Sequence, residues 1–288
     1  MDFAENYSFI IQDASQGYHW NNSQATIHPF VVYYKDETTG SLSNISIACI
    51  SDHKEHNTVA VYAFQSVVLE YVGMRLPFLE KAFYFSDGCA GQYKNFKNLA
   101  NLSFHKEDFN FDAEWHFFAT SHGKNACDGV GGTVKRTAAY ASLQRTKCDQ
   151  ILTPRQLFEF CKKEISGIIS FYISSEEIER KKPFLEDRFS KSKRIPGIRS
   201  HHAFIPKCHG NFIMSRVSGD VANEIENVDM ECATNIEINT LNAGNYVACM
   251  YEKEWFVGMV EDISGEHNDV QVKFMHPKAP ANAFKWPV

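Results

Sequence analysis

The stretch FYFSDGCAGQYKN, residues 83–95, decides the fold. Its apolar run ends at Asp87, and a Gly-Cys-Ala-Gly turn then opens a polar segment. A short apolar run that stops at a carboxylate and a glycine-rich turn indicates a buried strand that ends at the edge of a sheet. Two further acids have similar surroundings: Asp2 in MDFAENY and Asp128 in SHGKNACDGVGGTVKR.

The segments around these acids predict an alternation of strands and helices. We expect strands at residues 1–11, 25–35, 44–50, 81–86 and 113–120, and helices at 58–73, 93–104 and 133–143. Three antiparallel strands followed by alternating helices and strands give an α/β fold, with a mixed sheet flanked by helices. This order is ribonuclease H-like. It brings the first strand, the fourth strand and the last helix, and with them Asp2, Asp87 and Asp128, to one end of the sheet.

Carboxylates gathered at strand ends are suited to hold two divalent cations for phosphodiester chemistry. Such ions lie about 3.5–4 Å apart and stabilise the attacking and leaving oxygens. We therefore expect Asp2, Asp87 and Asp128 to be catalytic metal ligands for Mg²⁺ or Mn²⁺. Glu114 is an alternative third acid, and helix capping is the competing role for Asp128.

Basic and polar side chains follow the second and third acids and could contact phosphates. The candidate DNA-binding residues are Lys94, Lys97, His122, Lys135 and Arg136. An ordinary solvated helix face is the competing interpretation for each lysine. Zinc binding by His122, Cys127 and Cys89 is a weaker alternative, because these residues lack the close spacing of zinc ligands.

The character of the chain changes after about residue 150. Residues 1–150 are expected to form the core, and residues 151–209 a helical extension with capping boxes at Thr153 and Ser174 and a basic stretch at 180–207. Residues 210–243 are acidic and aperiodic, which indicates a linker. Short alternating strands at residues 244–288 predict a small β-barrel of the SH3 or Tudor kind.

Composition limits the classes of function. The chain has 288 residues and a formal net charge of −6, so DNA binding would require local basic patches. No apolar run approaches the roughly 18 residues of a membrane span, so we expect no membrane partner. The eight cysteines are scattered, which favours a reducing compartment.

Four phrases carry a resemblance to a known family: MDFAENY, FSDGCAGQYKN, EWHFFATSHGKNACDGVGGTVKR and VKFMHP…FKWP. The sequence resembles the DDE/DDD transposases of eukaryotic cut-and-paste DNA transposons and transposase-derived proteins of invertebrate genomes. The resemblance implies a ribonuclease H-like core, double-stranded DNA as partner, a homo-oligomer and a nuclear location. It also implies strand cleavage and transfer that depend on Mg²⁺ or Mn²⁺, with Asp2, Asp87 and Asp128 as the acids.

One departure from that family affects the expected activity. Asp2 is the second residue, so the first strand lacks its beginning, and the end-recognising DNA-binding domain of such transposases does not precede it. A truncated or domesticated copy is therefore expected. The alternative function is that of a non-catalytic, transposon-derived DNA- or chromatin-binding protein.

Overall fold

The computed structural model describes residues 1–10, 23–118, 125–146, 149–208, 210–217, 242–251, 254–264, 269–278 and 283–285. The chain divides into two compact units, Met1–Asp229 and Met230–Val288, called unit 1 and unit 2 below. Each unit is described by itself. None of the helices in the described ranges combines the length and apolar character needed to cross a bilayer.

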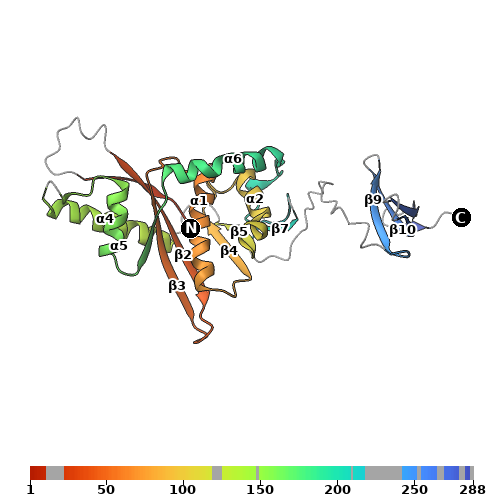
Figure 1. The fold of residues 1–288 in the computed structure, drawn as a ribbon, viewed down its shortest axis with the longest axis horizontal. Helices are drawn as coiled ribbons and strands as arrows, with labels where there is room; N and C mark the ends of the chain where they lie inside the picture. Colours follow the sequence, from red (N-terminus) through yellow and green to blue (C-terminus); the bar gives the residue numbers. More distant parts are fainter. Residues whose placement is uncertain are drawn as a thin grey trace. The chain divides into compact units, whose positions relative to one another are not determined.

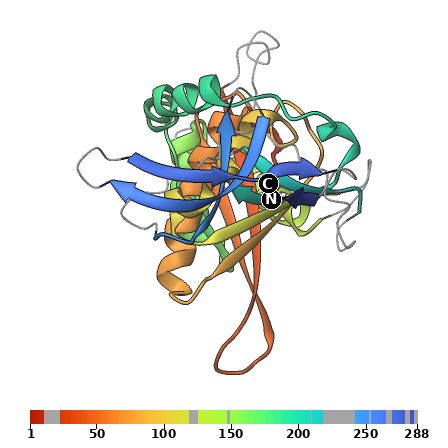
Figure 2. The ribbon, with the colours of Figure 1, turned by 90° about the vertical axis from the view of Figure 1, so that its right-hand side faces the viewer.

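The first sheet of unit 1 has four strands in the order β1-β2-β3-β6. The strands are β1 (Ala4–Ser8), β2 (Gln24–Lys35), β3 (Leu42–Ser51) and β6 (Ile168–Tyr172). The first three are antiparallel, and β6 adds parallel to β3. The β2–β3 hairpin extends away from the rest of unit 1, in orange at the bottom of Figure 2. Its turn contains Gly40 at a positive φ of 68°, where the absence of a side chain removes the strain.

The second sheet of unit 1 has the order β4-β5-β7-β8. Its strands are β4 (Lys81–Ser86), β5 (Asp112–Phe117), β7 (Ala203–Cys208) and β8 (Asn211–Ser215). β4 and β5 are parallel, and β7 and β8 are antiparallel to their neighbours. The Met1 ammonium donates a hydrogen bond to the Phe85 carbonyl oxygen at 2.9 Å. The two sheets therefore approach each other where the chain start meets the end of β4.

Helices cover both faces of the first sheet (Figure 1). One face packs against α4 (Ala126–Gln144) and α5 (Pro154–Glu164), and the other against α1 (Thr58–Arg75). The α1 helix also packs on the second sheet, through Val61 and Leu69, beside α2 (Phe96–Ser103). The shorter α3 (His105–Phe109), α6 (Ser175–Lys191) and a 3₁₀ turn at Ile198–Ser200 complete the helices of the described part of unit 1.

Local sequence signals explain where most of these helices begin. Asn57 caps α1, and its side chain accepts a hydrogen bond from the Ala60 amide. Both expected capping boxes are confirmed: Thr153 with Gln156 begins α5, and Ser174 with Glu177 begins α6. The expected α/β architecture is confirmed in the coarse form of mixed sheets flanked by helices. The strands expected in one mixed sheet are divided between two sheets, because β4 pairs with β5 and β5 pairs with β7 instead of adding to β1–β3.

Several boundaries differ from the expectation. The α4 helix begins at Ala126 rather than near residue 133, so Asp128 and the three following glycines lie within the helix. Residues 151–209 do not form a separate extension. Their strand β6 belongs to the first sheet of unit 1, and their strand β7 belongs to the second. The β8 strand lies within the expected acidic linker 210–243. Most of that linker, residues 218–241, is outside the described ranges.

Unit 2 contains antiparallel strands. Three of them, in the order β11-β10-β9, form a sheet from β9 (Tyr246–Tyr251), β10 (Glu254–Ser264) and β11 (Asp269–Phe274). The short strands β12 (His276–Lys278) and β13 (Ala283–Lys285) pair with each other. The described strands of unit 2 do not close into a barrel. Gly258 on β10 is tightly packed, since an added Cβ would lie 2.9 Å from the Lys273 carbonyl oxygen.

Candidate functional site

Asp2 is held by hydrogen bonds to β2 and to the N-cap of α4. Its amide donates to the Pro29 carbonyl oxygen on β2 at 3.3 Å, and its Oδ2 accepts from Asn125 Nδ2 at 3.3 Å. The neighbouring Phe3 ring stacks on His56 at 4.3 Å and meets His28 edge-on at 4.2 Å. These contacts hold the start of the chain on the sheet, so Asp2 is positioned by its neighbours although it lies next to the first residue.

Asp87 follows the last residue of β4 directly. Its Oδ1 accepts a hydrogen bond from the Cys89 amide at 3.1 Å, which is a short turn that reverses the chain after the strand. The preceding Ser86 is buried, and its hydroxyl accepts from Trp115 Nε1 at 2.9 Å. The buried strand end therefore fixes where the Asp87 carboxylate emerges.

Asp128 lies in the first turn of α4 and belongs to a capping box. Its Oδ2 accepts from the Asn125 amide at 3.0 Å, while the Asn125 side chain accepts from the amides of Cys127 and Asp128. Helix capping, the competing role for Asp128, is thus present. Because Asn125 also donates to Asp2, this one side chain links the first acid to the third. The sequence analysis did not select Asn125; its position as a helix N-cap beside an acid was the available signal.

The charges of the other two acids act on Asp2. Burial raises the pKa of Asp2, and the negative charges of Asp87 and, more weakly, Asp128 raise it further, against the lowering effect of the Asn125 hydrogen bond. Within the described residues, however, no group of three or more His, Cys, Asp or Glu side chains is arranged to hold a metal ion. The charges of Asp87 and Asp128 therefore reach Asp2, but the three acids do not form a closed ligand set.

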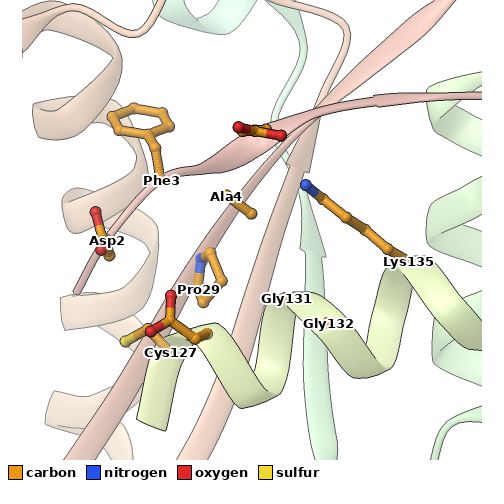
Figure 3. Close-up of a pocket in the computed structure, with 10 residues that line it drawn as sticks. Asp2, Phe3, Ala4, Pro29, Cys127, Gly131, Gly132 and Lys135 are labelled. Carbon is orange, nitrogen blue, oxygen red and sulfur yellow. The ribbon is translucent and has the colours of Figure 1, made fainter. Parts of the chain in front are cut away.

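A groove runs between β1 and α4, and its lining includes Asp2 and Asp128 but not Asp87. Asp2 and Cys127 lie at one end of it and Lys135 at the other, with Gly131 and Gly132 between them (Figure 3). Burial lowers the pKa of Lys135, and the Glu5 carboxylate, which also lines the groove, opposes that effect. The groove therefore combines carboxylates, a half-buried cation and a stretch of helix without side chains.

A buried polar pair lies beneath the acids. His28 Nε2 is 2.8 Å from the Tyr93 hydroxyl, and both residues are fully buried. Burial, followed by the charges of Asp2 and Asp87, raises the pKa of Tyr93 well above its ordinary value. Burial also holds the pKa of His28 well below its usual range, so this histidine is neutral. Neither residue carried a recognisable signal in the sequence, because their pairing joins positions 65 residues apart.

The expected DNA-binding residues do not share one face. Lys94 donates to the Arg199 carbonyl oxygen at 3.2 Å, and Lys97 lies 5.4 Å over the Phe189 ring. These two lysines precede or begin α2, on the side of the sheets that carries α1, whereas Lys135 and Arg136 belong to α4 on the other side. Arg136 is exposed and His122 lies outside the described residues.

Two alternatives from the sequence can be located as well. Glu114 lies in the middle of β5, where it pairs with Lys81 and with His116 Nε2 at 3.1 Å, so its carboxylate is already engaged away from Asp87. Much of the basic stretch is also paired within the fold. Arg188 is buried against Asp108, and Lys191 bonds Asp187.

The comparisons with known proteins give a family without an assigned function. Residues 1–218 match the model of a family described as a domain of unknown function (DUF8701). The chain belongs to this family. The DUF8701 region covers β1 to β8 and contains all three acids, whereas unit 2 lies beyond it. No curated protein matches the chain, and no solved structure does.

Proposed function

We propose that this DUF8701 protein is a nuclear, transposase-like enzyme that cleaves and joins strands of double-stranded DNA as a homo-oligomer. The observation that carries the proposal is that Asn125 hydrogen-bonds both Asp2 and Asp128, while the charges of Asp87 and Asp128 raise the pKa of Asp2. Like charges gathered in a partly buried place cost free energy unless a cation compensates them. The order of the first strands and helices supports a ribonuclease H-like core, and the strands of unit 2 support an SH3- or Tudor-like module.

The chemistry of the donor set fits Mg²⁺ or Mn²⁺. Both ions prefer carboxylate oxygens, and Mg²⁺ sites often use few carboxylates together with water and substrate phosphates. In each of the three acids a hydrogen bond fixes one oxygen and leaves the other without a hydrogen-bond partner among the described residues. When bound, two such cations would stabilise the attacking and leaving oxygens of an in-line displacement at phosphorus.

The residues of the chain then have separate tasks. Asp2, Asp87 and Asp128 would hold the cations, and Asn125 would orient Asp2 relative to Asp128. Lys135 would contact a DNA phosphate across the groove, beside Gly132, where an added Cβ would meet nothing within 4 Å. Catalysis in this scheme comes from positioning and charge neutralisation.

Cleavage of DNA tests the enzymatic proposal. The full chain is incubated with supercoiled plasmid and Mn²⁺, and the nicked product is measured over time for the wild type and Asp87→Asn. We expect nicking by the wild type, loss of nicking in Asp87→Asn, and normal nicking in Asp187→Asn, an exposed carboxylate on α6. Equal nicking by Asp87→Asn, or nicking that persists in EDTA, would reject the metal-ligand role.

DNA binding tests the role of Lys135, which lines the groove, and of Arg136, the exposed cation next to it on α4. Replacing Lys135 and Arg136 with alanine should weaken binding to all duplexes alike. The slope of log affinity against log salt should flatten by roughly one to two units, because fewer counterions are released. A duplex affinity that depends neither on the salt concentration nor on these substitutions would contradict a groove that faces DNA.

The second candidate function is non-catalytic binding of DNA or chromatin. The observation that favours it is the absence of a ready group of three metal ligands among the described residues. It predicts salt-sensitive duplex binding with no nicking and no change on Asp87→Asn. The two experiments above therefore distinguish the candidates.

A further inference from the structure

One face of the second sheet of unit 1 carries exposed aromatic rings. On β4, Phe83 and Phe85 are 57% and 45% exposed, whereas Tyr84 between them is buried. Phe118, directly after β5, is 37% exposed. The helices α1 and α2 pack on the other face, around Tyr84 and Trp115. Exposed aromatic residues gathered on one sheet face indicate a binding surface rather than a core.

Neighbouring rings of this face lie close together, with their planes inclined to one another by 19° to 34°. Phe85 stacks on His116 with centroids 5.0 Å apart and planes at 19°, and Phe118 lies 6.2 Å from Phe85 at 27°. Phe83 is 6.3 Å from the His116 ring on the other side. His116 is itself buried, so Phe83, Phe85 and Phe118 are the exposed rings of this face. The name β4–β5 platform is used below for these three rings together with His116.

The charges on the platform compensate one another. Lys81 pairs with Glu114 and lies 5.3 Å over the Phe83 ring, and Glu114 also contacts His116 Nε2. A face whose charges are internally paired does not attract phosphates by itself. It suits the neutral, flat surface of a base, which gains by stacking on an aromatic ring.

The platform continues into the carboxylate site. Phe83 and Phe85 are alternate residues of β4, about 6.6 Å apart, and Asp87 follows directly after the last residue of that strand. The Phe85 carbonyl oxygen accepts the hydrogen bond from Met1, next to Asp2. A nucleic-acid strand with a phosphate at the acids would therefore carry its neighbouring bases over the platform.

We propose that the β4–β5 platform binds unpaired bases of a DNA strand by stacking, next to the carboxylate site. The inference deepens the proposed function and rests on it for the choice of DNA as the polymer. Stacking on a sheet requires bases that are not paired, so single strands, frayed ends or distorted duplexes are the expected ligands. A protein partner or a second copy of the chain would instead use the same rings as an apolar contact.

Binding in EDTA tests the platform separately from cleavage. The probe is a fluorescein-labelled oligo(dT) of about 20 nucleotides, enough to span a single-strand site. Fluorescence anisotropy gives the affinity of the full chain for this strand and for its duplex with oligo(dA). We expect the single strand to bind more tightly than the duplex at equal salt.

Substitutions separate stacking from apolar contact. Phe83→Leu and Phe85→Leu keep an apolar side chain but remove the ring, and they should weaken oligo(dT) binding by about tenfold. Phe85→Trp should keep the affinity. Tyr33→Leu, which removes a 58% exposed ring on β2, is the matched control and should change nothing. Thermal unfolding of each variant confirms that it is folded.

Three results would overturn the proposal: no binding of oligo(dT) by the wild type, equal affinity of Phe85→Leu, or self-association in light scattering that Phe83→Leu abolishes. Strand binding is measured in EDTA, so it does not depend on cleavage. A protein that binds oligo(dT) in EDTA but does not nick plasmid in Mn²⁺ supports the platform and rejects the cleavage proposal. If the wild type nicks plasmid and Phe85→Leu binds oligo(dT) as tightly as the wild type, the cleavage proposal is supported and the platform is rejected.

Discussion

At the scale of single residues, Asp2 has the most unusual environment of the three acids. Burial and the charge of Asp87 both disfavour its ionised form, and only the Asn125 hydrogen bond and the nearby chain terminus favour it. An acid whose pKa is raised in the folded state stabilises the fold in its protonated form. This stabilisation is complete below the ordinary value of 3.8 and is lost as the pH rises through the folded-state value.

Asp2→Asn should therefore stabilise the protein at neutral pH. The amide keeps the shape of the side chain and removes the charge, so the repulsion from Asp87 and Asp128 disappears. The midpoint of thermal unfolding should be higher than that of the wild type at pH 7 and should converge with it near pH 3.8. A lower midpoint at pH 7 would show that ionised Asp2 is favourable where it lies.

The same residue should couple stability to divalent cations. Mg²⁺ at about a hundredfold above its dissociation constant should stabilise the wild type by roughly 2.7 kcal/mol, through binding to the folded state alone. Urea unfolding with and without Mg²⁺ measures this difference. The control variant Asp187→Asn should respond as the wild type does, whereas a full response in Asp2→Asn would exclude Asp2 as a ligand.

At the scale of elements, α4 approaches the first sheet closely at one glycine. An added Cβ at Gly131 would lie 3.1 Å from the Ala4 Cβ and 3.4 Å from Pro29, while an added Cβ at Gly132 would meet nothing within 4 Å. The glycines of this helix are therefore not equivalent. Gly131 sets the separation of α4 from β1 and β2, and Gly132 only lowers helix propensity.

These two glycines give opposite predictions. Gly132→Ala should stabilise the protein by about 0.5–1 kcal/mol, because alanine loses less backbone freedom in a helix. Gly131→Ala should destabilise it by about 1 kcal/mol, since β1 must move to admit the methyl group. Urea unfolding measures both. Stabilisation by Gly131→Ala would mean that the helix can move away at no cost.

The α6 helix is held to α3 by a buried ion pair. Arg188 NH1 and NH2 donate to the two oxygens of Asp108 at 2.7 and 2.8 Å, and the guanidinium lies 4.4 Å over the Phe104 ring. Arg188→Leu should cost about 3–5 kcal/mol, because it leaves the Asp108 charge buried without its partner. Lys191→Ala removes an exposed pair with Asp187 and should cost at most about 1 kcal/mol. Urea unfolding measures the unfolding free energy of both variants, and equal losses in Arg188→Leu and Lys191→Ala would contradict the expected difference.

At the scale of the whole molecule, the two units each have their own sheets and core. The buried clusters of unit 1 contain residues from β1 to β8. In unit 2, Val260 is buried within the three-stranded sheet, and Gly258 allows β10 and β11 to pack closely. A defect in one core should therefore leave the other core intact.

Gly258→Ala should unfold unit 2 selectively. The added methyl group would meet the Val272 side chain and the Lys273 carbonyl oxygen, at an expected cost of about 1–3 kcal/mol. Calorimetry should show a lower transition for unit 2 and an unchanged one for unit 1. A chain cut after Asp229 should retain the unit 1 transition. If that transition moves in either experiment, the units are not independent.

The sequence by itself determined the local elements and the identity of the three candidate acids. Apolar periodicity and capping residues are local signals, so β2, β3, α1, α5 and α6 could be predicted from the residues that form them. The strand end at Asp87 could be predicted for the same reason. The start of α4 was predicted too late, near residue 133, because the glycines after Asp128 have low helix propensity. In the structure, packing of the helix against Ala4 and Pro29 outweighs that low propensity, and α4 begins at Ala126.

Only the tertiary structure decided which distant residues meet. The pairing of β6 with β3 and of β7 with β5 depends on long-range contacts, which leave no periodic signal in the chain. The same is true of Asn125 between Asp2 and Asp128, of the His28–Tyr93 pair and of the β4–β5 platform. Each of these depends on the directions in which side chains leave neighbouring elements, and packing alone sets those directions.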